Sequence, residues 1–321
     1  MNTVSLLVLD GLLLISIVTL AWAALASSDA RRSVILFMAF GLLLAVAWSR
    51  LLAPDVALAE AAIGAGLSGA LLLAAVGEQS GARTRSARNA GHADVRPPVQ
   101  WVVTLLCAGL AGILGWGLLA GLDSGARDTL AQAVADNLAT SGVSNPVTAV
   151  LLNFRAYDTL LELAVLLTAV LGIFALGEAR PGYRFAGPVF DSLARWLVPV
   201  LILTAGYLLW VGAHAPGGAF QAGATLAAAA IVLRLAGRSH IGLPAGSLLR
   251  IVMAAGVAVF LLVGLALLVL GRPFLGYPPA WAGALILVIE SAAMLTIATT
   301  LVLAFLGGRP QPLSNMEQTR C

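Results

Sequence analysis

Hydrophobic runs follow one another along almost the whole chain, and short polar stretches separate them. A membrane-spanning helix needs about 20 mostly apolar residues, and about nine runs meet that criterion. The runs are roughly 4–26, 33–52, 55–76, 99–122, 147–176, 193–213, 218–236, 248–271 and 280–306. The pattern therefore predicts an all-α integral membrane protein. The fifth run is long enough that we expect it to tilt, kink or begin outside the bilayer.

Composition supports the membrane class. Of the 321 residues, 60% are hydrophobic and only 10% are charged, and the mean hydropathy is +0.98. A soluble domain would carry roughly a quarter charged residues. The chain has two cysteines, Cys107 in an apolar run and Cys321 at the end, and neither indicates a disulfide framework or a metal site.

The basic residues predict the orientation of the chain. All 18 are Arg. With the N-terminus outside, the outer loops hold only Arg50, Arg127 and Arg272, and Arg155 lies within a run. The remaining arginines fall in inner loops, as the excess of basic residues on the cytoplasmic side requires. We therefore expect the N-terminus outside and the C-terminus in the cytoplasm.

Polar breaks divide the chain into blocks. Residues 77–98 are polar, rich in Gly and end in Pro-Pro, which is typical of a flexible linker. In the outer break, Leu130, Val134 and Leu138 recur at helical spacing and predict a short surface helix. The expected organisation is a three-helix block (1–80), a cytoplasmic linker (81–98), a two-helix block with an external amphipathic segment (99–180), a four-helix block (190–309) and a cytoplasmic tail (310–321).

Several carboxylates interrupt the apolar runs. A charge at membrane depth is costly, so it usually faces a bundle interior or a water-filled path and marks ion or proton movement. Glu60 lies deep in the third run. The alternative for Glu60 is a hydrogen bond to a neighbouring helix. Asp55 follows Pro54 at the expected helix start, where it can cap free amides.

Asp158 and Glu162 are four residues apart and should share one helix face. Two carboxylates so close in a medium of low dielectric cannot both ionise cheaply, so one should hold a proton. Such a pair suits proton relay or cation binding. Arg155 offers the alternative, because it lies three residues before Asp158 and can form a structural ion pair with it.

A break between two later runs reads GAHAPGGAFQAG, from Gly212 to Gly223. Broken backbone at membrane depth occurs only where it is buried in protein or lines a cavity. A tight external hairpin explains the same residues equally well. His214 can titrate near neutrality, but a lone His in a turn is more often solvated. Glu290 lies in the middle of the last run, and a pathway role and a hydrogen bond to a partner helix are both open for it.

The chain offers little sign of enzyme chemistry. Residues 64–69 (GAGLSG) fit the letters of a dinucleotide-binding fingerprint, but no strand precedes them and they lie within an apolar run. Their small side chains, with Ala61, Ala62 and Ala65, suit close helix packing instead. We find no metal-ligand spacing or nucleotide-binding loop, and expect neither a cofactor nor an enzyme activity.

Three segments resemble parts of known transport complexes. Ala53–Gly66 (APDVALAEAAIGAG) resembles the MbhD-type domain, and Ser141–Leu176 resembles the MbhE-type segment. In Mrp-type multisubunit cation/proton antiporters these form part of the C-terminal region of the large A subunit. Gly212–Ala229 resembles the G-H-x-x-P-G-G-G-F pattern of the B subunit, MnhB. The resemblance implies an A-subunit end fused to a B subunit.

The resemblance also implies roles and partners. Glu60, Asp158 and Glu162 match acidic positions tied to the ion or proton pathway. Asp55, Arg155, His214 and Glu290 are possible pathway residues from their own positions in the sequence, not from the resemblance. Pro216, Gly217, Gly218 and Phe220 match the B-subunit motif. In that motif, Ala213 and Ala219 replace usual glycines. The chain lacks Lys, whereas the antiporter-like part of an A subunit carries proton-channel lysines.

We therefore expect a non-enzymatic transport subunit in a bacterial inner membrane. It would work beside large A- and D-type and small C-, E-, F- and G-type subunits and would line a path for Na⁺ or H⁺. The same modules recur in membrane-bound hydrogenases and are similar to a small membrane subunit of complex I. An ion-translocating module of such a complex is thus the first alternative. A structural scaffold with inert, paired acids is the second.

Overall fold

A computed structural model describes residues 3–86, 97–123, 129–178, 187–238, 243–244 and 246–310. It confirms an all-α membrane protein. Within the described residues, eight helices are long and apolar enough to cross a membrane, and the shorter apolar helix α10 (Ala219–Leu235) matches the remaining expected run. The outward N-terminus and the cytoplasmic C-terminus stay predictions.

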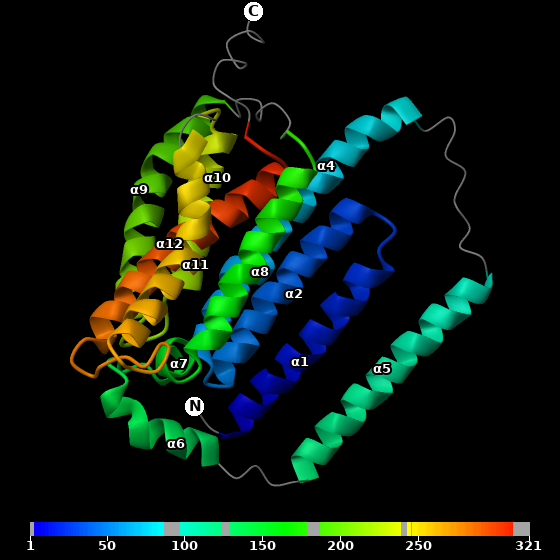
Figure 1. Ribbon diagram of the computed structural model, residues 1–321. Helices are drawn as coiled ribbons and strands as arrows, with labels where there is room; N and C mark the ends of the chain where they lie inside the picture. Colours follow the sequence, from blue (N-terminus) through cyan, green and yellow to red (C-terminus); the bar gives the residue numbers. More distant parts are fainter. Residues whose placement is uncertain are drawn as a thin grey trace, which may run out of the picture. The chain divides into compact units, whose positions relative to one another are not determined.

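The chain forms two compact units, Met1–Val76 with Asn137–Cys321, and Gly77–Asp136. The helices, most of which are labelled in Figure 1, are α1 (Thr3–Ala26), α2 (Ala30–Arg50), α3 (Pro54–Ala59), η1 (Glu60–Leu67), α4 (Ser68–Ser86), α5 (Pro97–Asp123), α6 (Thr129–Asn137), η2 (Leu138–Thr140), α7 (Pro146–Ala149), η3 (Val150–Phe154), α8 (Ala156–Ala175), α9 (Pro188–Val211), α10, α11 (Gly246–Val269) and α12 (Ala282–Leu306).

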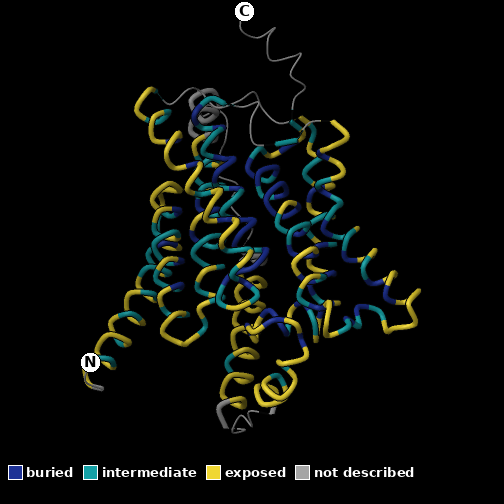
Figure 2. Tube along the Cα trace, turned by 90° about the vertical axis from the view of Figure 1, so that its left-hand side faces the viewer, coloured by how far each residue is buried: buried dark blue, intermediate teal, exposed yellow. Residues whose placement is uncertain are grey.

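Helices α10 and α12 form the centre of the larger unit. Helix α12 packs against α8, α9, α10 and α11, and 56% of its most apolar stretch is buried, whereas none of that of α1 is. Figure 2 shows the buried residues in the interior of the bundle. Small side chains let the backbones of α10 and α12 approach closely, since a Cβ added at Gly223 would lie 2.8 Å from Cγ2 of Ile297.

Helices α1 and α2 and the segment α3–η1 form the N-terminal part of this unit. An ion pair joins α1 to α2, with Arg50 Nε 2.8 Å from Asp10 Oδ1. The small-residue face expected around residues 61–69 meets α2, because a Cβ added at Gly41 would lie 3.0 Å from Cβ of Ala65. Residues 64–69 therefore lie in helix, and their small side chains serve packing.

The structure differs from the expected boundaries in two places. Helix α4 continues to Ser86 and α5 begins at Pro97, so both ends of the expected linker 81–98 are helical, and residues 87–96 lie outside the described part. Isolated Gly residues weaken a helix by only about 1 kcal/mol each, so they did not end α4. The long fifth run breaks at Arg155, where φ is −127° and the helix is interrupted before α8.

The smaller unit contains the end of α4, helix α5 and most of α6. Helix α5 is apolar and long enough to span a membrane. Helix α6 confirms the short helix expected from the spacing of Leu130 and Val134.

Candidate functional site

The chain breaks between α9 and α10 at Pro216, Gly217 and Gly218. Gly218 precedes α10 with φ of +102°, a conformation that side chains rarely adopt. Space is equally tight, since a Cβ added at Gly212 would lie 2.5 Å from Cα of Gly218. Both Gly217 and Gly218 are buried. The structure therefore places these two glycines inside the protein and not in a solvated hairpin.

The segment before α8 covers this break and satisfies its carbonyl groups. The backbone N–H of Ser144 donates to the carbonyl oxygen of Ala213 at 2.8 Å. The Thr148 hydroxyl donates to the carbonyl oxygen of Gly212 at 2.6 Å. Irregular backbone at membrane depth is stable only when its polar groups are paired in this way.

Asp55 reaches the same break from the first turn of α3. Its Oδ1 atom accepts a hydrogen bond from the backbone N–H of Gly217 at 3.2 Å and from Nδ2 of Asn145 at 3.4 Å. Nε2 of Gln221 donates to the Asp55 carbonyl oxygen at 3.2 Å. The sequence suggested that Asp55 caps its own helix. The N-cap position belongs to Ala53 instead, and the Asp55 carboxylate bonds across to Gly217.

Glu290 approaches the break from α12. It is 2% exposed, and its Oε1 atom accepts a hydrogen bond from the backbone N–H of Ala219 at 3.3 Å. Among the described residues, its Oε2 atom has no hydrogen-bond partner. The carboxyl group thus lies at the N-terminus of α10, where free N–H groups and the helix dipole favour negative charge.

Asp55 and Glu290 line one cavity of about 250 Å³. The cavity lies within the larger unit and draws on α3, α7, η3, α8, α10 and α12. Its lining comprises Asp55, Val56, Ala59, Val147, Thr148, Leu151, Leu152, Thr159, Gly217, Gly218, Ala219, Phe220, Gln221, Glu290 and Ala293.

The chemistry of this lining suits a proton or a small hydrated cation. Water occupies about 30 Å³ per molecule in the liquid, so the cavity has room for several molecules. Two carboxylates, two threonine hydroxyls and the amide of Gln221 supply oxygen atoms, which are the ligands that hard cations prefer. The rest of the wall is apolar and keeps the local dielectric low, which strengthens electrostatic interactions inside it.

Glu60 lies elsewhere, at the start of η1. Its carboxyl group folds back over Gly64 and toward Gly41 of α2, where an added Cβ would lie 3.2 Å from Oε1. Glu60 is partly buried and does not line the cavity formed by Asp55 and Glu290.

Asp158 and Glu162 lie on the outer face of α8. Asp158 Oδ2 is 2.6 Å from Nε of Arg155, and both side chains are substantially exposed. The structure therefore contains the Arg155–Asp158 pair that the sequence offered as the alternative. Glu162 is exposed in this chain. Neither acid is among the residues that line the cavity.

The remaining motif residues divide between the cavity and its rim. Phe220, Gly217 and Gly218 line the cavity, and Pro216 precedes them. His214 is exposed, with Nδ1 3.1 Å from the hydroxyl oxygen of Ser144 and its ring edge-on to Trp210.

Three polar residues of the site were missed in the sequence: Thr148, Thr159 and Gln221. The sequence carries one usable signal for them, which is a hydrogen-bonding side chain within an apolar run. Thr residues are common in such runs because they bond to their own helix, so the signal does not distinguish these positions. Asn145 was also missed, and its side chain connects Asp55 to the carbonyl oxygen of Ala215 at 3.0 Å.

Two protein-family models match the chain, one in its N-terminal part and one in its C-terminal part. Residues 15–80 match the family MbhD, which is named for one of the subunits of MBH. Residues 189–308 match MnhB, a "domain related to MnhB subunit of Na+/H+ antiporter". No curated protein sequence matches the chain.

Two solved structures share the fold. A chain of the Mrp complex from Dietzia sp. DQ12-45-1b aligns with a TM-score of 0.68 and 23% identity, over 92% of this chain and 34% of that one. A chain of the membrane-bound sulfane sulfur reductase, an archaeal respiratory membrane complex, aligns with a TM-score of 0.52 and 23% identity, over 64% of this chain and 97% of that one. The chain thus spans about a third of the Mrp chain. The chain shares its fold with this Mrp chain and joins an MbhD-type region to an MnhB-type region in one polypeptide.

Proposed function

We propose that this chain is a membrane subunit of an Mrp-like multisubunit Na⁺/H⁺ antiporter and that its central cavity forms part of the ion or proton path. One observation carries the proposal. Asp55 from the MbhD-type region, Gly217 and Gly218 from the MnhB-type motif, and Glu290 from the last helix line the same cavity.

Asp55 and Glu290 have different roles in this proposal. Asp55 is held by neutral donors, the N–H of Gly217 and the amide of Asn145, and supplies a fixed carboxylate. Glu290 has one carboxyl oxygen free of hydrogen bonds within the described residues, so it can take up and release a proton or a cation. An ion can move past the fixed carboxylate of Asp55 only if a second group, here Glu290, binds it and releases it again.

Glu60, Asp158 and Glu162 extend the path in this proposal, as their positions in the family motifs suggested. Asp158 and Glu162 are exposed or half-exposed in this chain, and lipid contact would be costly for both. A neighbouring subunit is therefore expected to cover that face of α8. Large A- and D-type subunits with small C-, E-, F- and G-type subunits would complete the exchanger, in a bacterial inner membrane.

A second candidate function rests on the likeness to the archaeal respiratory complex, whose aligned chain is covered almost entirely. In this alternative the chain is an ion-translocating module driven by a redox partner. The same cavity would serve, because the proton or cation step does not depend on the source of energy.

Purification of the native complex separates the two candidates. We expect antiporter-like membrane subunits and, in vesicles, dissipation of a pH gradient when Na⁺ is added. Co-purification of iron–sulfur or nickel subunits, without Na⁺-dependent exchange, would favour the redox-linked module.

Replacement of Glu60, Asp158 and Glu162 by Ala in the assembled complex then tests the extended path. Undiminished exchange in all three variants would exclude those acids from it. Normal assembly with lost exchange would exclude the scaffold role.

A further inference from the structure

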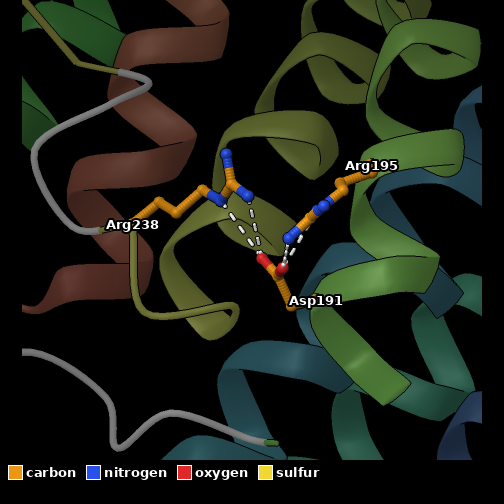
Figure 3. Close-up of polar contacts among 3 residues, drawn as sticks. All are labelled: Asp191, Arg195 and Arg238. Atoms are coloured by element: carbon orange, nitrogen blue, oxygen red, sulfur yellow. Dashed lines mark hydrogen bonds and ion pairs between the residues drawn. The ribbon is translucent and has the colours of Figure 1, made fainter. Parts of the chain in front are cut away.

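A second charged cluster lies between α9 and the end of α10. Asp191 pairs with two arginines at once (Figure 3). Its Oδ2 atom is 2.5 Å from Nη2 of Arg195, and its Oδ1 atom is 3.0 Å from Nη2 of Arg238. The Asp191 side chain is 14% exposed, whereas those of Arg195 and Arg238 are 66% and 38% exposed. The two guanidinium groups are therefore more exposed than the partly buried carboxylate that they surround.

The cluster carries a net charge of +1, since two guanidinium groups surround one carboxylate. Asp191 accepts hydrogen bonds from Nε and Nη2 of each arginine. A guanidinium group has five N–H donors, so each arginine keeps three, the two on Nη1 and the second on Nη2. Figure 3 shows the third nitrogen of Arg238 pointing away from Asp191. A monoanion with several acceptor oxygens complements both the charge and the remaining donors.

A cavity of about 240 Å³ lies beside this cluster. Its wall is amphipathic, because it combines two arginines with four apolar residues. It is lined by Ala194, Arg195, Val198, Pro199, Leu233 and Arg238.

An apolar cavity of about 180 Å³ shares Leu233 with this wall. It also contains Ile202, which lies one helical turn beyond Val198 on α9. Its lining is entirely apolar except for one threonine, Thr299. An amphipathic pocket with two arginines, followed by an apolar pocket along the same helix, is suited to a headgroup followed by an acyl chain.

We propose that Arg195 and Arg238 form a binding site for the phosphodiester headgroup of an anionic phospholipid, with an acyl chain along the apolar cavity between α9, α10 and α12. A phosphodiester carries one negative charge and so balances the net charge of the cluster. Basic pockets between membrane helices bind such headgroups. The apolar continuation selects a lipid over free phosphate.

The test compares lipids on the full-length chain in detergent micelles. The binding of phosphatidylglycerol, phosphatidylcholine and inorganic phosphate is measured by native mass spectrometry and by the shift in Tm. We expect a larger Tm shift with phosphatidylglycerol than with phosphatidylcholine, and a negligible one with phosphate. Equal shifts for the two lipids, or an equal shift with phosphate, would overturn the proposal.

The triple variant Asp191→Asn/Arg195→Gln/Arg238→Gln removes the site without leaving the Asp191 charge unpaired. It should bind phosphatidylglycerol at least about fivefold more weakly than wild type, given about 1 kcal/mol per arginine near a membrane surface. Arg272→Gln is the matched control, because Arg272 is exposed in the loop after α11, and it should bind as wild type does. Unchanged binding by the triple variant would contradict the proposal.

A second variant tests the site even if the triple variant does not fold. Asp191→Asn alone keeps both arginines and raises the net charge of the cluster to +2. It should bind phosphatidylglycerol more tightly than wild type, and weaker binding would count against the site.

Discussion

Glu290 places a carboxyl group at the N-terminus of α10, where the unpaired N–H groups of the first turn favour a negative charge. The hydrogen bond from the backbone N–H of Ala219 replaces only part of the hydration that the Glu290 carboxyl group loses on burial. A carboxyl group so deeply buried either carries a proton or is balanced by a cation. Alternation between these two states is the elementary step that a cation/proton exchanger requires.

Gly218 is the residue that lets the Glu290 carboxyl group come close to the N-terminus of α10. A Cβ added there would lie 2.9 Å from Oε1 of Glu290, and φ is +102°. We therefore expect Gly218→Ala to lower cation/proton exchange by the complex, because the methyl group displaces the carboxyl. The backbone strain alone should cost about 1–3 kcal/mol in stability.

Gly187→Ala is a close control. Gly187 has φ of +99° at the N-cap of α9, and a Cβ there would meet no atom within 4 Å. Exchange in vesicles and Tm are measured for both variants. A similar loss of Tm with loss of exchange only in Gly218→Ala supports the account, whereas equal exchange in the two variants contradicts it.

Tyr277 gives a prediction of pH dependence outside the membrane-spanning helices. It is 8% exposed in the loop before α12, and its hydroxyl has no hydrogen-bond partner among the described residues. Burial raises the pKa of the Tyr277 hydroxyl. The unfolded chain, with a tyrosine pKa of about 10, therefore releases this proton first, and stability is lost as pH rises above about 10.

Tyr277→Phe should leave Tm unchanged or raise it at pH 8, since an unpaired buried hydroxyl contributes no net stability. It should also reduce the fall in Tm between about pH 8 and pH 10.5, the range in which an exposed tyrosine begins to ionise. Tyr207→Phe changes an exposed tyrosine of α9 and is the control. A lower Tm for Tyr277→Phe at pH 8 would show that the hydroxyl has a partner.

At the scale of elements, two π-helical segments flank the site. Segment η1 begins at Glu60, and η3 ends at Phe154 before the break at Arg155. A π-helical turn widens the backbone and shifts the faces that follow, and it occurs often at functional sites. Leu151 and Leu152 of η3 line the cavity. The wide turn therefore shapes its wall.

The contact between α2 and η1 holds the MbhD-type helices together. A Cβ added at Gly41 would lie 3.0 Å from Cβ of Ala65 and 3.2 Å from Oε1 of Glu60. Gly41→Leu should therefore push η1 away from α2 and reduce stability by about 1–3 kcal/mol, as overpacking does, which is measured as a lower Tm. Gly11→Leu is the control, because a Cβ at Gly11 would meet nothing within 4 Å. Equal Tm values for the two variants would refute the close packing.

The helices could be predicted from the sequence because each apolar run has the length of a membrane span. The site could not, for reasons visible at particular residues. Hydropathy does not show that Asp55 bonds to Gly217, since 162 residues separate them. Nor does it separate Glu290, which enters the cavity, from Glu162, which lies on an exposed face. A hydrophobic pattern with a period of 3.6 residues also does not predict where π-helical turns occur.

At the scale of the whole molecule, the cavity requires both family regions and the segment between them. Asp55 comes from the MbhD-type region and Glu290 from the MnhB-type region. Thr148 and Thr159 come from the segment that resembles MbhE. A fused chain supplies all three parts in fixed proportion. We therefore expect this shared cavity to carry a step of cation/proton exchange.

The decisive experiment for this cavity is exchange by the assembled complex with Glu290→Gln. Na⁺-dependent dissipation of a pH gradient is measured in everted vesicles, and co-purification of the other subunits monitors assembly. Asp136→Asn, which changes an exposed acid of α6, is the control and should exchange as wild type does. We predict that Glu290→Gln assembles normally and loses most of its exchange, because Gln has the same shape but cannot take up and release a proton. Normal assembly with undiminished exchange would contradict the account.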